Sequence, residues 1–113
     1  MGELESEILG RLWAATGALT PGEVVDSMKA PPAYTTVMTI LTRLWRKGIV
    51  EREPRGRAFA YRPLLTEAEF AAQKMRLTLE GTSNRMAALS HFVGSLSKKE
   101  ERSLRRIIEQ MDS

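Results

Sequence analysis

The sequence predicts a mainly α-helical protein with one small β-hairpin, followed by a second region that is helical throughout. Three observations lead to this fold class. Residues 3–47 show three runs of helical periodicity joined by short connections, and two short β-prone runs follow them. After Pro63 only helical periodicity continues. We therefore expect two domains, residues 1–63 and residues 64–113.

The first two predicted helices are short and well delimited. Residues 3–15 place apolar side chains at four-residue spacing and carry glutamates at the start, where the helix dipole favours them. The second helix begins at Thr20, which can form a capping box with Glu23, and it continues to about residue 30. The two prolines that follow end it and set a tight connection to the next helix.

The third predicted helix, which ends at Gly48, has two faces with different chemistry. One face is a narrow apolar stripe suited to a core. The other carries threonines first and cations later, without the Glu–Lys pairs typical of a solvated helix. Hydroxyl groups near a helix start can reach base edges, and later cations can reach phosphates. The alternative is that the threonines are tolerated surface residues. The stripe consists of Val37, Ile40, Leu41 and Leu44.

A β-hairpin is predicted directly after this helix. Residues 49–53 and 57–62 form its strands, and Pro-Arg-Gly at 54–56 supplies the turn. Phe59 and Tyr61 share one face of the second strand, which suits them to cover the three-helix core. Three helices followed by a basic hairpin form a winged helix, in which the longer third helix would enter the major groove of DNA.

Basic charge gathers around the third helix and the hairpin, although the net charge of the chain is only +3. Residues 43–62 hold seven basic and two acidic side chains, whereas residues 1–30 hold two basic and five acidic ones. Arg55 and Arg57 fall at the hairpin tip, where a wing would straddle a phosphate backbone. This distribution favours a polyanion as partner. The alternatives are a solvated basic surface and a polar hairpin tip without any partner.

Three further helices are predicted after Pro63, and together they are too short to bury a sufficient core alone. We expect a second copy of the chain as partner, because two-fold homodimers are the commonest soluble oligomers. Packing back onto the first domain as a monomer is the alternative. The residues predicted for dimerisation share the apolar faces of these helices: Phe70, Met86, Leu89, Phe92, Val93, Leu104, Ile107, Ile108 and Met111.

Several classes of function are not expected. The chain has no cysteine and a single histidine, His91, so we expect no disulfide, no metal site, no cofactor and no catalytic residue. His91 itself is interpreted as a partly buried interface residue. No run of about 18 apolar residues and no signal peptide is present, which favours a cytoplasmic protein without membrane insertion.

The third helix and hairpin resemble the recognition helix and wing of the BlaI/MecI penicillinase-repressor family, in the segment AYTTVMTILTRLWRKGIVEREPRGRAFAYRP. The agreement extends upstream through LESEILGRLW and TPGEVVDSM, and downstream into SHFVGSLSKKEERSLRRII. The resemblance implies a winged-helix homodimer without enzymatic activity, which represses β-lactam resistance or related stress genes by binding a palindromic operator in double-stranded DNA. A winged helix that contacts another protein without specific DNA binding is the alternative function.

Combining the resemblance with the helical-wheel pattern assigns candidate DNA contacts. The base-edge candidates are Thr35, Thr36, Met38, Thr39 and Arg43. The phosphate candidates are Tyr34, Arg46, Lys47, Arg55 and Arg57.

The resemblance also implies a mode of induction. In the best-studied branch of the family, a membrane-bound sensor metalloprotease causes the repressor to be cut inside the dimerisation region, commonly at an Asn-Phe pair. The matching candidate position here is His91-Phe92, so histidine replaces the asparagine. Copper-responsive relatives bind metal through C-terminal cysteines, which this chain lacks. We expect relief of repression by proteolysis or by disruption of the dimer.

Overall fold

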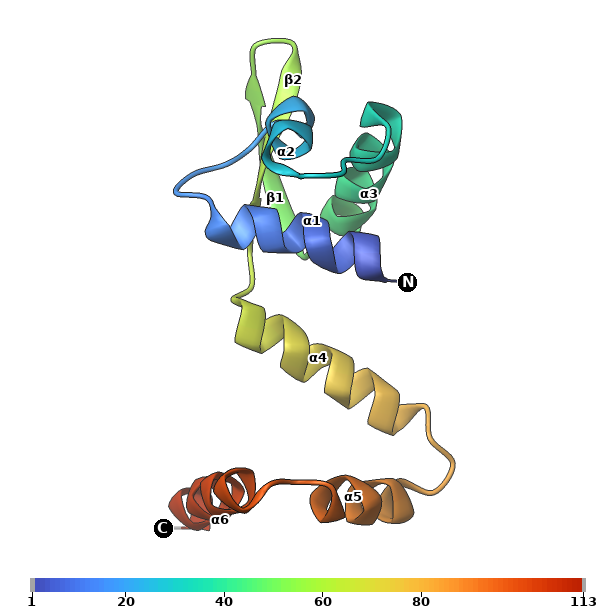
Figure 1. Cartoon of the computed structure of the whole chain (residues 1–113), viewed down its shortest axis with the longest axis vertical. Helices are drawn as coiled ribbons and strands as arrows, with labels where there is room; N and C mark the ends of the chain where they lie inside the picture. The colour runs from blue at the N-terminus through green and yellow to red at the C-terminus, as the bar shows by residue number, and fades with distance from the viewer. Residues whose placement is uncertain (1, 113) are drawn as a thin grey trace. The chain divides into compact units, whose positions relative to one another are not determined.

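The computed structural model describes residues 2–112, which divide into two compact units after Ala71 (Figure 1). The order of elements agrees with the predicted fold class. The elements are α1 (Glu3–Ala14), α2 (Pro21–Ser27), α3 (Tyr34–Arg46), β1 (Val50–Arg55), β2 (Ala58–Pro63), α4 (Glu67–Glu80), α5 (Arg85–Gly94) and α6 (Lys98–Asp112).

Helix α2 begins as the sequence predicts and ends earlier. The amide of Glu23 donates to Thr20 Oγ1 at 3.2 Å, and the amide of Thr20 donates to Glu23 Oε1 at 2.9 Å, which completes the capping box. The helix ends at Ser27 instead of continuing to about residue 30. Met28 already has an extended backbone, which leads the chain into the connection to α3 while its side chain stays in the core.

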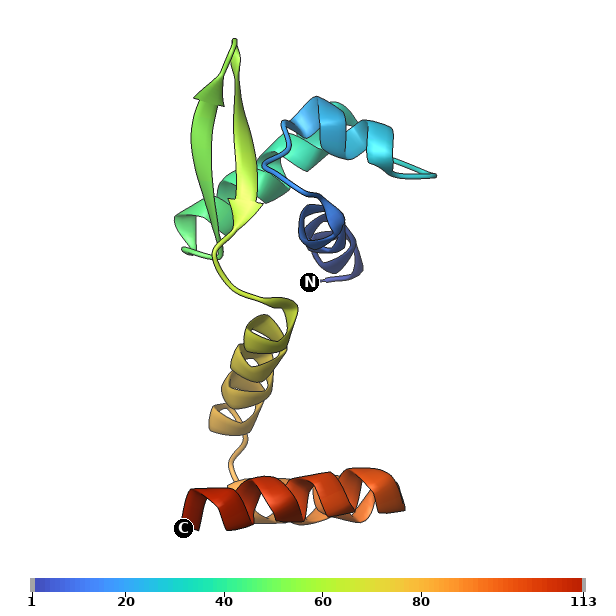
Figure 2. The ribbon, with the colours of Figure 1, turned by 90° about the vertical axis from the view of Figure 1, so that its left-hand side faces the viewer.

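The first unit has a core built from all three helices and the hairpin. Its largest fully buried side chains are Ile8, Leu9, Val24, Val37, Leu41, Leu44 and Val50. The segment before α2 extends the sheet, because the amide of Leu19 donates to the Tyr61 carbonyl at 2.9 Å and the amide of Tyr61 donates to the Leu19 carbonyl at 2.7 Å. These contacts attach β2 to the helices, while the turn of the hairpin projects beyond them (Figures 1 and 2).

The turn of the hairpin differs from the predicted Pro-Arg-Gly turn. Strands β1 and β2 pair antiparallel from Val50↔Pro63 to Arg55↔Ala58, which leaves Gly56 and Arg57 as a two-residue loop. Gly56 has φ 63°, and a type II′ turn requires a positive φ at this first central position. The preceding proline lies inside β1, where an edge strand tolerates it.

The prediction that both hairpin aromatics cover the core is right for one of them. Tyr61 is 3% exposed and belongs to the core, whereas Phe59 is 40% exposed. Phe59 lies two residues nearer the turn and is not among the side chains packed in the core. Its ring instead contacts the guanidinium of Arg52 on the neighbouring strand.

Phe70, predicted to lie at a dimer interface, is placed in the core of the first unit. It is 8% exposed, and its ring centroid lies 5.8 Å from that of Trp13. The indole of Trp13 also donates to the Leu65 carbonyl at 2.9 Å, so the chain after β2 is attached to α1. A side chain buried in this way is not available to a partner, and Phe70 leaves the set of candidate interface residues.

The second unit contains helices whose starts are capped by side chains but whose apolar side chains remain uncovered. The amide of Glu100 donates to Ser97 Oγ at 3.1 Å and that of Ala87 to Asn84 Oδ1 at 3.0 Å, which caps α6 and α5. From residue 72 to residue 112 no side chain is buried. No helix within residues 2–112 is long and apolar enough to cross a membrane.

Candidate nucleic-acid interface

Helix α3 separates its core side chains from a continuous exposed face. Val37, Leu41 and Leu44 are fully buried, which fixes the rotation of the helix. The five residues predicted to contact base edges are all exposed: Thr35, Thr36, Met38, Thr39 and Arg43. The structure therefore brings the predicted set together on the side of α3 that faces away from the core.

The hydroxyl of Thr39 is partly committed within the helix. Its Oγ1 donates to the carbonyl of Thr35 at 2.9 Å, the back-bond that threonines often form inside helices. The hydroxyl hydrogen is thereby used, while the oxygen can still accept a bond and the methyl group remains available for apolar contact. A threonine in this state suits a thymine methyl group or a base amino group.

The start of α3 presents backbone donors as well as side chains. Its N-cap is Ala33, whose side chain cannot cap, and the first amides in the helical pattern are those of Thr36 and Val37, which donate to the Ala33 carbonyl. The amides before them lack an intrahelical acceptor, as at any helix start. Together with the helix dipole, they favour a negatively charged group beside the exposed ring of Tyr34.

The cations near the end of α3 differ in how far they are already neutralised. Arg43 and Arg46 are exposed, and no carboxylate within the described chain forms an ion pair with either. Lys47, by contrast, lies 3.7 Å from Glu5 of α1, measured from Nζ to Oε2. Arg43 and Arg46 therefore contribute more uncompensated positive charge than Lys47.

The hairpin tip shows the same contrast between two arginines. Arg57 is exposed in the turn and has no ion pair among residues 2–112. Arg55 Nη1 lies 3.1 Å from the Ala18 carbonyl oxygen and 3.4 Å from Glu23 Oε1. The hydrogen bond from the Thr20 amide lowers the pKa of Glu23 most, and the charge of Arg55 lowers it further. Of the two predicted wing contacts, Arg57 is thus the freer.

One group that sequence reasoning missed lies between α3 and the hairpin. The guanidinium carbon of Arg52 is 3.6 Å from the ring centroid of Trp45 and 4.0 Å from that of Phe59. Arg52 pairs with Tyr61 across the strands, so Phe59 is its diagonal neighbour on the same face. The correct register of the hairpin would have revealed this pair, but the predicted turn gave a different register.

Comparison with known proteins shows which family the chain belongs to. A family model described as "Penicillinase repressor" matches residues 1–110. The chain belongs to the penicillinase repressor family. It is 35% identical to the transcriptional regulator BlaI of Mycobacterium tuberculosis over 118 aligned residues, covering 100% of this chain and 86% of the relative. It is also 26% identical to a penicillinase repressor of Bacillus licheniformis, over 96% of this chain and 88% of that one.

Solved structures of the family agree with the architecture of the first unit. The DNA-binding domain of the repressor BlaI matches 61% of this chain and 85% of its own, at 25% identity and a TM-score of 0.54. Bacillus licheniformis BlaI, solved as a monomer in complex with the blaP half-operator, matches the same shares at 27% identity and a TM-score of 0.50. The predicted winged-helix fold and family are confirmed, and the family is one of repressors and not of enzymes.

Proposed function

We propose that this chain is a homodimeric, sequence-specific DNA-binding repressor that binds a palindromic operator. The observation that carries the proposal is the exposed face of α3, which combines threonines, Met38 and two unpaired arginines, together with the freer cation of the wing, Arg57. This face belongs to a chain of a repressor family. The relative from Bacillus licheniformis carries the same type of domain in its complex with a half-operator.

Base recognition would fall to the exposed face of α3 in the major groove. Arg43 can donate two parallel bonds to the O6 and N7 atoms of a guanine, the commonest specific contact of this kind. Thr39 would add a methyl contact to thymine or accept a bond, since its hydroxyl hydrogen is already donated. Thr35, Thr36 and Met38 would complete the reading of each half-site.

The DNA backbone would be held from two sides. On the helix side, Tyr34, Arg46 and Lys47 lie at the two ends of α3, and on the hairpin side Arg55 and Arg57 lie at the tip. Each phosphate neutralised by such a cation should add about −0.9 to the slope of log affinity against log salt. Lys47 and Arg55 would contribute less than the others, because each must first leave a carboxylate.

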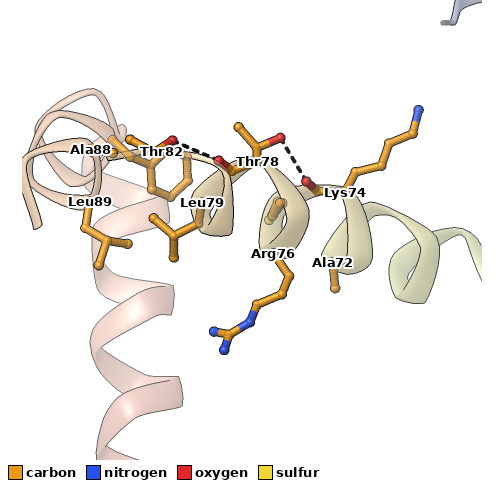
Figure 3. Close-up of a pocket in the computed structure, with 10 residues that line it drawn as sticks. Ala72, Lys74, Arg76, Thr78, Leu79, Thr82, Ala88 and Leu89 are labelled. Carbon is orange, nitrogen blue, oxygen red and sulfur yellow. Dashed lines mark hydrogen bonds between the residues drawn. The ribbon is translucent and has the colours of Figure 1, made fainter. Parts of the chain in front are cut away.

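Dimerisation through the second unit is supported by its uncovered apolar surface. Leu79 of α4 and Leu89 of α5 line a groove of about 620 Å³ (Figure 3). The hydroxyls of Thr78 and Thr82 beside it donate to carbonyls of α4 at 2.9 and 2.8 Å, so the groove offers few free polar groups. A second copy could cover this groove and the apolar stripe of α6. The other candidate interface residues are Met86, Phe92, Val93, Leu104, Ile107, Ile108 and Met111.

Repression would be relieved by separating the two copies or by cutting the dimerisation region. The candidate position, His91-Phe92, lies in α5, a helix without any buried residue, so little packing within one chain would oppose local opening. A membrane sensor protease would be the upstream partner. A chain that ends after His91 tests this step. It should bind a half-site normally and a full operator no better, whereas retained full-site affinity would contradict the proposal.

Fluorescence-anisotropy titration tests the function as a whole. The protein is titrated against its own upstream intergenic DNA and against a scrambled duplex of equal length, at two salt concentrations. We expect about a hundredfold preference for the native duplex, within the range known for specific binders, with saturation at two chains per site. Equal, salt-sensitive binding to both duplexes would contradict the proposal and favour contact with another protein.

A further inference from the structure

We propose that Arg52 is a positioning residue that fixes the wing relative to the recognition helix and does not itself contact DNA. The inference rests on the DNA-binding function proposed above. Its basis is the bridge that Arg52 forms between Trp45 in the last turn of α3 and Phe59 in β2. Three elements of the first unit thus meet at one guanidinium group.

The guanidinium of Arg52 lies close to both aromatic rings. Its carbon lies 3.6 Å from the centroid of Trp45 and 4.0 Å from that of Phe59, well within the distance at which cation–π attraction operates. Arginine is suited to this place because its flat, weakly hydrated guanidinium stacks on aromatic faces. Arg52 is only partly exposed, in contrast to the arginines of the wing tip. Its charge is therefore already engaged by aromatic rings.

The position of the wing depends on contacts of this kind. Between α3 and β1 the chain turns at Gly48, which has φ 76°, and only Lys47 to Ile49 connect the two elements. The backbone pair of Leu19 and Tyr61 holds one edge of the hairpin to the segment before α2. The bridge through Arg52 joins the hairpin to the end of α3. The hairpin is thus attached both to the segment before α2 and to the end of α3.

A fixed angle between α3 and the wing matters because both would bind the same duplex. The cations of α3 and Arg57 at the wing tip can contact phosphates together only if their separation matches the DNA backbone. A site works best when its side chains are held rigidly by surrounding contacts. Loss of the bridge would detach the hairpin from the end of α3, although Arg55 would still hold it to Ala18 and Glu23. Binding would then have to restore the angle between the wing and α3 at the expense of affinity.

Arg62 provides a matched control on the same hairpin. Arg52 pairs with Tyr61, and Arg62 is the next residue along the strand, so its side chain lies on the opposite face of the hairpin. Its guanidinium pairs with Glu51 at 2.8 Å and with Glu53 at 3.1 Å, away from both aromatic rings. Arg62→Met removes the same charge from the same hairpin as Arg52→Met. Only the latter removes the bridge.

The experiment measures operator affinity and its salt dependence for the full-length wild type, Arg52→Met, Arg62→Met, Arg57→Ala and the double variant Arg52→Met/Arg57→Ala. Arg52→Met should weaken operator binding by about tenfold, the order expected for two partly exposed cation–π contacts acting together. Arg62→Met should weaken it by less than about threefold. In the Arg57→Ala background, Arg52→Met should have a clearly smaller further effect, because the freer of the two wing contacts that it positions is already absent.

A second arm needs no DNA. In the free protein, the Arg52 Nε–H resonance should be displaced by the currents of the two rings. The neutral substitution Trp45→Leu should move it toward the position of an exposed arginine and should also reproduce the loss of operator affinity. Thermal unfolding of each variant shows whether the fold is retained. An Arg52 resonance that Trp45→Leu leaves unchanged would overturn the bridge directly.

The outcomes separate this inference from the proposed function. A wild type that binds operator and scrambled DNA alike would overturn both. A wild type that binds specifically, with losses from Arg52→Met and Arg57→Ala that add in full, would overturn only the positioning role and make Arg52 a direct contact. Equal affinities of Arg52→Met and Arg62→Met would overturn it as well.

Discussion

The two units of this chain differ in how many of their apolar side chains are buried. The first surrounds a core in which Leu41 and six other large side chains are fully buried. The second, from residue 72 to residue 112, buries none of its side chains, and Met86 is 76% exposed. Exposed apolar surface of this extent marks an interaction site in a natural protein. The comparison teaches that the first unit has a core of its own, whereas the second exposes its apolar side chains and, in our proposal, covers them with a second copy.

The largest expected effect is on the core of the first unit. Leu41→Ala should lower the free energy of unfolding by about 2–5 kcal/mol, because it removes buried methyl groups and leaves a cavity. Urea denaturation followed by tryptophan fluorescence measures this, since both tryptophans, Trp13 and Trp45, lie in the first unit. Leu77→Ala on the exposed surface of α4 is the control and should change the transition little. Equal losses would contradict the comparison.

Self-association should depend on the second unit. Ile108 is about half exposed on the apolar stripe of α6, and Ile108→Gln should weaken the dimer by about 2 kcal/mol if it lies at the centre of the interface. Sedimentation velocity over a range of concentrations measures the dissociation constant. Arg106→Gln on the polar side of the same helix should leave it nearly unchanged. A dimer that tolerates Ile108→Gln would place the interface elsewhere.

A smaller effect distinguishes the two kinds of cation in the first unit. Arg46→Ala should weaken binding to all DNA sequences alike and reduce the salt slope by about 0.9. Arg55→Ala should reduce it by less, because Arg55 is already paired with Glu23. Arg76→Ala, which removes an exposed arginine paired within α4, is the control and should change neither quantity. If Arg55→Ala and Arg46→Ala have equal effects, the pair with Glu23 has no influence on binding.

The smallest expected effect is on pH dependence. The pKa of Glu23 is lowered in the folded chain, chiefly by the hydrogen bond from Thr20. A lowered pKa stabilises the fold above the ordinary carboxyl pKa, and this contribution is lost as the pH falls through the folded value. Glu23→Gln keeps the capping box without the charge. Its free energy of unfolding should fall less than that of the wild type between about pH 6 and about pH 3. Parallel curves would contradict this.

Local signals in the sequence predicted most of the first unit. The capping box of Thr20 with Glu23 predicted the start of α2, and the apolar stripe of α3 predicted which face would be exposed. These features depend on neighbours within a few residues. The position of the hairpin turn depended instead on which residue could adopt a positive φ, and Gly56 did so as the first residue of the loop.

Contacts between residues far apart in the sequence could not be predicted from local sequence patterns. Arg55 meets Glu23 across 32 positions, and Phe70 packs on Trp13 although its own helix continues into the second unit. In the sequence, an apolar residue that packs within its own chain cannot be distinguished from one that packs against another chain. The role of Phe70 therefore could not be separated in advance from that of Phe92, which remains exposed.

The division of roles between the units can be tested most directly with two lengths of DNA. Wild type and Ile108→Gln are titrated against a full palindrome and against a single half-site by fluorescence anisotropy. The account predicts equal half-site affinities for the two proteins, together with a preference for the full site of at least about a hundredfold in the wild type that nearly disappears in the variant. An undiminished full-site preference in Ile108→Gln would contradict it, because cooperation between half-sites would then not depend on the second unit.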